Sequence, residues 1–92
     1  MITLQSLITR NEIGFLVSEL GNEMVMMNTK TGDYIGLNEV SAEIWKLMAQ
    51  PVKAEEIINN LVIHYEVDKQ ICENQTIECL NRMLKQGIIQ VN

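Results

Sequence analysis

The side chains that most often carry chemistry are few in this chain, and their spacing does not suit catalysis. The single histidine, His64, falls in a predicted helix, and no motif places a cysteine, serine or aspartate beside it. A general base needs such a partner within hydrogen-bond reach, so we interpret His64 as structural. The chain also has no phosphate-binding glycine loop, no His-Glu-x-x-His and no Cys-x-x-Cys. We therefore expect a protein that is not an enzyme and that uses no cofactor.

The two cysteines, Cys72 and Cys79, are seven residues apart in another predicted helix. At a rise of about 1.5 Å per residue they lie roughly 10 Å apart, which is too far for a disulfide. No third ligand accompanies them for a metal ion, so we expect two reduced core thiols and no metal site. The acidic side chains of the helices are typical of solvated faces rather than of an acid–base pair: Glu43, Glu55, Glu56, Glu66, Glu73 and Glu78.

Length and composition indicate one small domain. The chain has 92 residues, of which 47% are hydrophobic, enough for a packed core. We expect a single domain over residues 1–92 with its core at about 12–91. No run of about 18 apolar residues is present, and the first ten residues lack the pattern of a secretion signal. These features predict a cytoplasmic protein with no membrane partner.

The net charge of −5 argues against nucleic-acid binding. Such proteins carry a basic face, because neutralising phosphates supplies most of their affinity. The seven lysines and arginines are instead spread from Arg10 to Lys85 without a cluster.

Three strands are predicted in the first half of the chain. Residues 14–19 and 23–28 flank Leu20-Gly21-Asn22, a tight hairpin turn. A second turn at Thr29–Gly32 leads into a short strand at Tyr34–Leu37. The pattern predicts a three-stranded antiparallel meander whose last strand is an edge.

Three helices follow the strands. The first is predicted from Glu39 to Ala49 with Asn38 as its N-cap, and its apolar face carries Val40, Ile44, Leu47 and Met48. The second covers Ala54–Tyr65 and is expected to fray at its start, because Lys53 is not a capping residue. The third begins after the N-cap Asp68 and ends at Gln86 before Gly87. Residues 88–91 either form a final short strand or close the core.

Two surfaces are more apolar than a free-standing domain requires. In the middle strand Met24 and Met26 point one way and Val25 and Met27 the other, so both faces are apolar. The N-terminal segment 2–8, a second copy or a partner must cover the second face. The third helix has an apolar arc of about 160°. The surplus lies at its two edges, one at Cys72 and Cys79 and the other at Ile77 and Leu84.

Several segments resemble the protein D family of pyrroloquinoline quinone biosynthesis, the winged-helix-like element that recognises precursor peptides in ribosomal natural-product pathways. The longest is Thr31-Gly32-Asp33-Tyr34-Ile35-Gly36-Leu37-Asn38-Glu39-Val40-Ser41-Ala42-Glu43-Ile44-Trp45. The others are Ala54-Glu55-Glu56-Ile57, Tyr65-Glu66-Val67-Asp68 and Leu84-Lys85-Gln86-Gly87-Ile88-Ile89. Together they extend from about Gly14 to the C-terminus. Lys53 and Cys79 depart from the residues usual in the family.

The resemblance implies an α+β, winged-helix-like fold in which a three-stranded antiparallel meander is followed by three helices. It also implies a non-catalytic binder of the leader segment of a precursor peptide, presented to a separate leader protease or modifying enzyme. The stand-alone recognition protein of a lasso-peptide pathway is the most similar type. The peptide would add as a strand to the edge and lie against the third helix, which implies these binding residues: Asp33, Tyr34, Ile35, Gly36, Leu37, Cys72, Gln75, Thr76 and Cys79.

Two other functions are compatible with parts of the sequence. A winged-helix DNA-binding regulator would share the helix order but needs a basic third helix, which Glu73 and Glu78 oppose. A structural dimerisation module, a homodimer, would account for the two apolar faces of the middle strand without any peptide.

Overall fold

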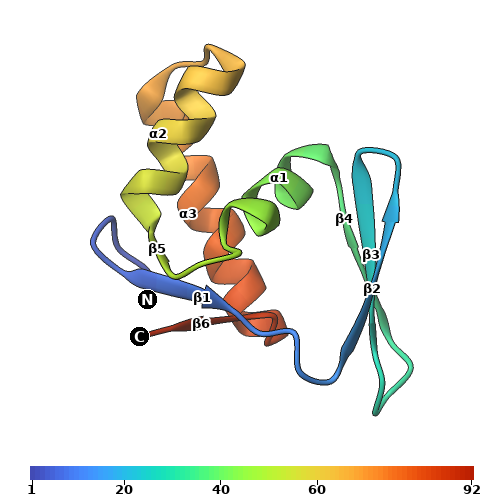
Figure 1. Ribbon diagram of the computed structural model, residues 1–92. Coiled ribbons are helices and arrows are strands. Elements are labelled where there is room, and N and C mark those ends of the chain that lie inside the picture. Colours follow the sequence, from blue (N-terminus) through green and yellow to red (C-terminus); the bar gives the residue numbers. More distant parts are fainter. The chain divides into compact units, whose positions relative to one another are not determined.

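A computed structural model describes all 92 residues, and they divide into two compact units (Figure 1). Residues 12–46 form one unit, called here the sheet unit. Residues 1–11 and 47–92 form the other, called here the helical unit. The element order confirms the predicted α+β arrangement of an antiparallel meander followed by three helices, and it adds three short strands.

The sheet unit is built on the predicted meander of β2 (Phe15–Leu20), β3 (Glu23–Asn28) and β4 (Tyr34–Leu37). The strand order is β2-β3-β4, so β4 is an edge, as predicted, and β2 is the other edge. A two-residue loop joins β2 to β3, and Gly21 takes a φ of 67° there, which side chains other than glycine resist. Asn28 closes the second turn by accepting hydrogen bonds from the backbone N–H groups of Lys30 and Thr31.

Helix α1 (Glu39–Leu47) starts directly after β4, and the predicted cap is confirmed. The Asn38 side chain accepts a hydrogen bond of 2.9 Å from the backbone N–H of Ser41, which satisfies one of the unpaired donors of the first turn. The predicted apolar face is partly wrong. Val40 is 46% exposed, whereas Ala42 and Trp45 are buried together with Ile44.

The helical unit contains a second sheet of order β5-β1-β6, formed by β1 (Leu7–Arg10), β5 (Val52–Lys53) and β6 (Ile89–Val91). Of the two alternatives for residues 88–91, the short strand is therefore correct. Within the N-terminal segment, β1 pairs with both β5 and β6. Ile2 and Ile8, which precede the core predicted from the sequence, are buried.

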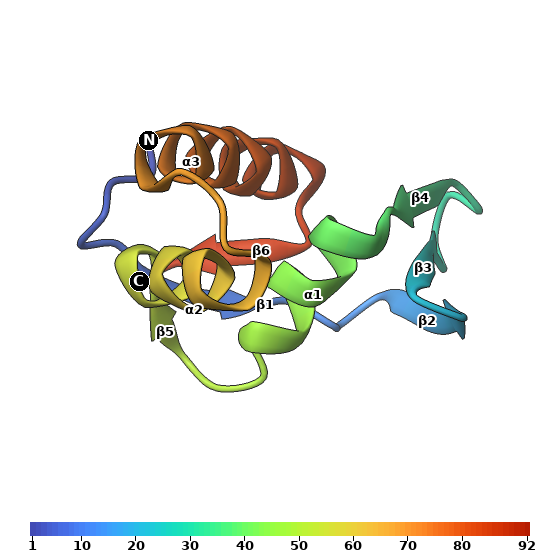
Figure 2. The same ribbon diagram turned by 90° about the horizontal axis from the view of Figure 1, so that it is seen from above.

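Helices α2 (Ala54–Tyr65) and α3 (Lys69–Gln86) pack against each other in the helical unit (Figure 2). Lys53 provides no side-chain cap for α2, as predicted, but the carbonyls of Ser6 and Leu4 accept from the N–H groups of Ala54 and Glu55. The reason for expecting fraying therefore does not hold, because a distant backbone segment replaces the missing cap.

The predicted limits of α3 are confirmed. Asp68 accepts a 3.0 Å hydrogen bond from the Ile71 N–H at the start of the helix. At its end Gly87 adopts a φ of 79°. Its N–H reaches the Leu84 carbonyl, and the Ile88 N–H reaches that of Met83, which is a Schellman ending. No helix of the chain has the length and apolar character required to cross a membrane.

Candidate functional site

The free edge of β4 is the part of the sheet unit with the chemistry to hold another chain. β4 pairs only with β3, so its other side presents backbone groups without a strand partner. Such an edge is a template for adding a further strand. Two conditions must hold for that addition: outward-facing N–H and C=O groups, and room for a second backbone.

The register decides which backbone groups face outward. In an antiparallel pair, opposed residues alternate between hydrogen-bonded and non-hydrogen-bonded pairs. The Asn28 N–H donates to the Asp33 carbonyl at 2.8 Å, and these residues continue the register in which Met26 faces Ile35. The Asp33 carbonyl and the backbone groups of Ile35 and Leu37 are therefore directed toward β3, whereas the Asp33 N–H donates to the Thr31 hydroxyl at 3.2 Å. The alternate residues, Tyr34 and Gly36, direct theirs to the free edge.

The edge also has room for an added backbone. Gly36 is exposed, and a Cβ atom built on it meets nothing within 4 Å. The Tyr34 side chain is 71% exposed. At the two ends of the strand the carboxylates of Asp33 and Glu39 are exposed, so the edge is open and lies between negative charges.

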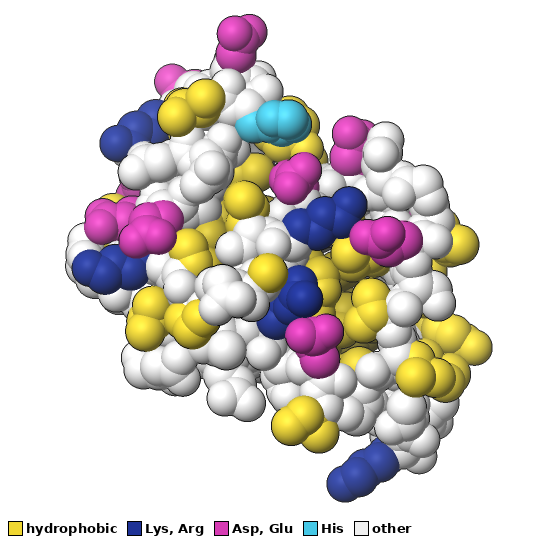
Figure 3. All heavy atoms as spheres, in the orientation of Figure 1, with side chains coloured by type: hydrophobic (Ala, Val, Ile, Leu, Met, Phe, Trp, Pro, Cys, Tyr) yellow, Lys and Arg dark blue, Asp and Glu magenta, His cyan; other side chains and the backbone are white.

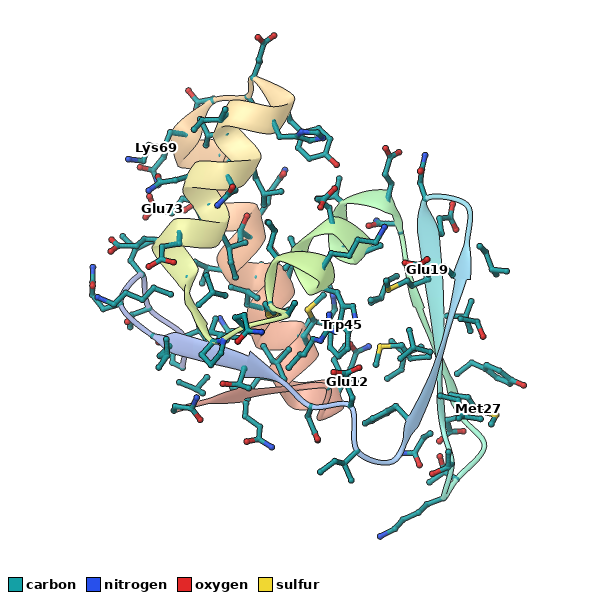
Figure 4. All side chains as sticks on the ribbon, in the orientation of Figure 1. Glu12, Glu19, Met27, Trp45, Lys69 and Glu73 are labelled. Atoms are coloured by element: carbon teal, nitrogen blue, oxygen red, sulfur yellow. The ribbon has the colours of Figure 1, made fainter.

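Side chains of β4 alternate between the two faces of the sheet. Ile35 is half-buried and Leu37 is 4% exposed, and both lie on the face that carries the buried Met24 and Met26. Tyr34 lies on the opposite face with Met27. Figure 4 shows Met27 on one side of the sheet and Trp45, which belongs to α1, on the other. A strand added to β4 would extend both faces of the sheet. The face with Met24 and Met26 is apolar and buried, whereas the face with Tyr34 is exposed.

The four predicted site residues of α3 lie in the helical unit. Cys72, Thr76 and Cys79 are buried, and the Cys72 Sγ lies 3.8 Å from the Thr76 Oγ1. Gln75 is the exposed member of the group. The burial identifies the Cys72 and Cys79 edge as the more enclosed edge of α3, since Ile77 and Leu84 are only half-buried. Neither cysteine is in a disulfide.

The helical unit contains a small cavity. It has a volume of about 100 Å³ and is lined by Leu4, Glu55, Ile58, Asn59, Lys69 and Glu73. Ligand pockets usually measure about 300–1,000 Å³. Lys69 and Glu73, labelled in Figure 4, come from the first turns of α3. A space of this size holds a few water molecules and cannot enclose a peptide.

β4 is the edge strand predicted from the sequence, but the predicted site did not distinguish its inward from its outward backbone groups. A signal was present in the turn chemistry. The residues on either side of a two-residue hairpin loop form a hydrogen-bonded pair, here Leu20 and Glu23, and this fixes the alternation along β3. Extending the alternation to β4 requires the register of a longer turn, which the sequence does not specify.

The fold and the edge define a class of protein: a small α+β domain with a three-stranded antiparallel meander, an exposed edge strand that leads directly into a helix, and a helical pair. The family model described as coenzyme PQQ synthesis protein D (PqqD) matches residues 23–89, which is more than half of the chain. The chain therefore belongs to the PqqD family. A comparison with curated proteins finds no match.

Two solved structures share the fold. The first is TbiB1 in complex with the TbiA(beta) leader peptide, which is 23% identical with a TM-score of 0.78, covering 89% of this chain and 94% of that one. The second is lasso peptide synthetase B1 complexed with the leader peptide, which is 18% identical with a TM-score of 0.78, covering 90% of this chain and 96% of that one.

Proposed function

We propose that this protein binds the leader segment of a ribosomally made precursor peptide, without transforming it, and presents it to a separate processing enzyme. The leader adds as a strand along β4. The observation that carries this proposal is the free edge of β4, where Tyr34 and Gly36 direct their backbone groups outward.

Strand addition suits a protein that must bind a flexible segment. The main-chain hydrogen bonds supply affinity, and pockets for alternate side chains supply specificity. Tyr34 and Gly36 together offer two donors and two acceptors, and Gly36 allows close approach of the added backbone. The proposed peptide-binding residues of β4 are Asp33, Tyr34, Ile35, Gly36 and Leu37.

Family membership and the two structural neighbours support the same proposal. Both neighbours are complexes with leader peptides, and each covers nearly all of its own length in the comparison. By analogy with the second neighbour, a lasso peptide synthetase B1, the pathway is of the lasso-peptide type. We also propose that α3 contributes to binding through the side of Gln75, with Cys72, Thr76 and Cys79 forming the apolar layer beneath it.

A non-catalytic role agrees with the side chains present. The structure contains no group of three or more His, Cys, Asp or Glu residues able to hold a metal ion. His64 is exposed and lies edge-on against Tyr65, with ring centroids 4.7 Å apart. We propose that a separate enzyme carries out the chemistry on the precursor.

DNA binding, the alternative suggested by the winged-helix-like order, is not favoured by the charges of α3. Its three basic side chains are interspersed with Glu73 and Glu78, and Arg82 pairs with Glu78 at 4.0 Å. A recognition helix for the major groove instead needs a basic face toward the phosphates.

Titration of the purified protein with the leader peptide of its own pathway tests the proposal. We expect saturable binding with one peptide per chain by calorimetry, and an unchanged precursor mass after incubation. A scrambled peptide of the same composition is the control. Equal affinity for the scrambled peptide, or cleavage without added enzyme, would contradict the proposal.

A further inference from the structure

The outer face of the sheet unit is an apolar surface that leader binding does not use. Directly opposed residues in neighbouring strands lie on the same face. The register therefore places two rows across all three strands, Leu16–Met27–Tyr34 and Ser18–Val25–Gly36, followed by the pair Leu20–Glu23. Strand addition occupies the edge of the sheet, so this face stays open when a leader is bound.

The exposure of this face is high for apolar side chains. Leu16 is 58% exposed, Leu20 63% and Tyr34 71%, and Val25 and Met27 are half-buried. A solvated sheet face normally carries polar residues at these positions. In the space-filling view of Figure 3, hydrophobic side chains gather along the margin of the sheet unit. Large apolar side chains gathered on one exposed sheet face are typical of an interaction surface.

The shape of the face favours a side chain inserted from a partner. The row Ser18–Val25–Gly36 has small residues at both ends, whereas the neighbouring row has the large side chains Leu16, Met27 and Tyr34. Rows lie about 7 Å apart along a strand. Ser18 and Gly36 therefore rise less above the sheet than the side chains of the neighbouring row. Tyrosine and methionine, both in that neighbouring row, are enriched in protein–protein interfaces.

The negative charge of the sheet unit indicates which kind of partner this face would bind. The sheet unit has six carboxylates and only two lysines, Lys30 and Lys46, and so carries −4 of the net charge of −5. Lys46 is already paired with Glu19 at 3.7 Å. A second copy of this chain docking face to face would bring two such units together, with like charges opposed. A complementary partner has an apolar patch bordered by lysines and arginines.

We propose that this outer face docks the enzyme that processes the leader, through an apolar surface of that enzyme bordered by basic residues. The proposal rests on the function proposed above. Tyr34 belongs both to the outer face and to the edge strand that holds the leader. An enzyme seated there lies within about one strand spacing, roughly 4.8 Å, of the bound peptide.

The test measures binding of the purified processing enzyme of the same pathway by sedimentation velocity and calorimetry. Leu16→Glu and Leu20→Glu each place a charge in the patch at exposed positions two strands from the leader-binding edge. We expect each to weaken enzyme binding by tenfold or more, with unchanged leader affinity. Glu23→Lys should weaken enzyme binding less than the leucine variants do, and it should reduce the salt dependence of enzyme binding. Ile63→Glu, at an 80% exposed position of α2, is the matched control and should bind normally.

The outcomes separate the two proposals. The docking surface would be overturned if the wild-type protein did not bind the enzyme detectably. It would also be overturned if both leucine variants bound the enzyme within twofold of wild type. Neither result would affect the proposal of leader binding. Self-association of the wild-type protein that Leu16→Glu abolishes would also overturn the docking surface, in favour of a second copy. A failure of the wild-type protein to bind leader is a separate readout, and it would overturn the function proposed above.

Discussion

Replacing Gly36 with proline tests strand addition at the position where the edge is most open. The proline removes one outward N–H donor and places a ring where the added backbone must approach. Since that N–H faces away from β3, the hydrogen bonds within the sheet remain intact. A lost backbone hydrogen bond costs about 0.5–1.5 kcal/mol, and an unpaired carbonyl on the buried peptide raises this to about 1–3 kcal/mol. We expect leader affinity to fall about 5- to 150-fold.

Two matched variants make this result interpretable. Gly36→Ala keeps the N–H, and its Cβ atom meets nothing within 4 Å, so leader affinity should stay close to wild type. Ile35→Pro removes an N–H that bonds to β3, so this variant should lose stability by thermal unfolding before its affinity is measured. Calorimetric titration of the folded variants decides the matter. Equal affinities of Gly36→Pro and Gly36→Ala would refute the assignment of the edge.

Three further predictions concern the helical unit. Glu66 takes a left-handed φ of 51°, so Glu66→Gly should raise the free energy of unfolding by about 0.5–1 kcal/mol, seen as a higher urea midpoint at unchanged slope. Asp68→Ala removes the N-cap of α3 and should lower the free energy of unfolding by about 1 kcal/mol in the same assay. Thr76 is 3% exposed, so Thr76→Glu should lower the free energy of unfolding by at least about 2 kcal/mol. Ile77 is only half-buried, so Ile77→Glu should lower it by less when both variants are measured by urea unfolding.

Local chemistry made much of the fold predictable from the sequence. Asn38 and Asp68 cap helices because their side chains satisfy donors only a few residues away. Gly21 and Gly87 mark the hairpin turn and the end of α3 through their positive φ values. Such signals act over short stretches of chain, and the structure confirms the elements that depend on them.

What the sequence did not reveal depends on residues far apart in the chain. The β5-β1-β6 sheet joins the two ends of the chain, and each strand has only two to four residues, too few for a periodic pattern. The start of α2 is satisfied by carbonyls of Leu4 and Ser6, which no local rule indicates. Val40 fits the helical period yet is exposed. Periodicity identifies the apolar face of a helix, but it does not show which residues of that face are covered by other elements.

The candidate site, like the fold, was predictable from the sequence only where local signals define it. Tyr34–Leu37 was identifiable as an edge because it is the last strand of a meander and runs directly into a capped helix. The direction of each backbone group depended on the register with β3, which only the structure supplies. The depth of Thr76 likewise depends on tertiary packing, since helical periodicity assigned it only to a broad apolar arc.

Amide hydrogen exchange measured residue by residue, with and without the leader peptide, tests the central claim most directly. We expect the amides of Tyr34 and Gly36 to become protected on binding, because they then donate to the added strand. The amides of Ile35 and Leu37, already bonded to β3, should change much less. Tight leader binding that leaves Tyr34 and Gly36 exchanging as fast as in the free protein would contradict strand addition at β4.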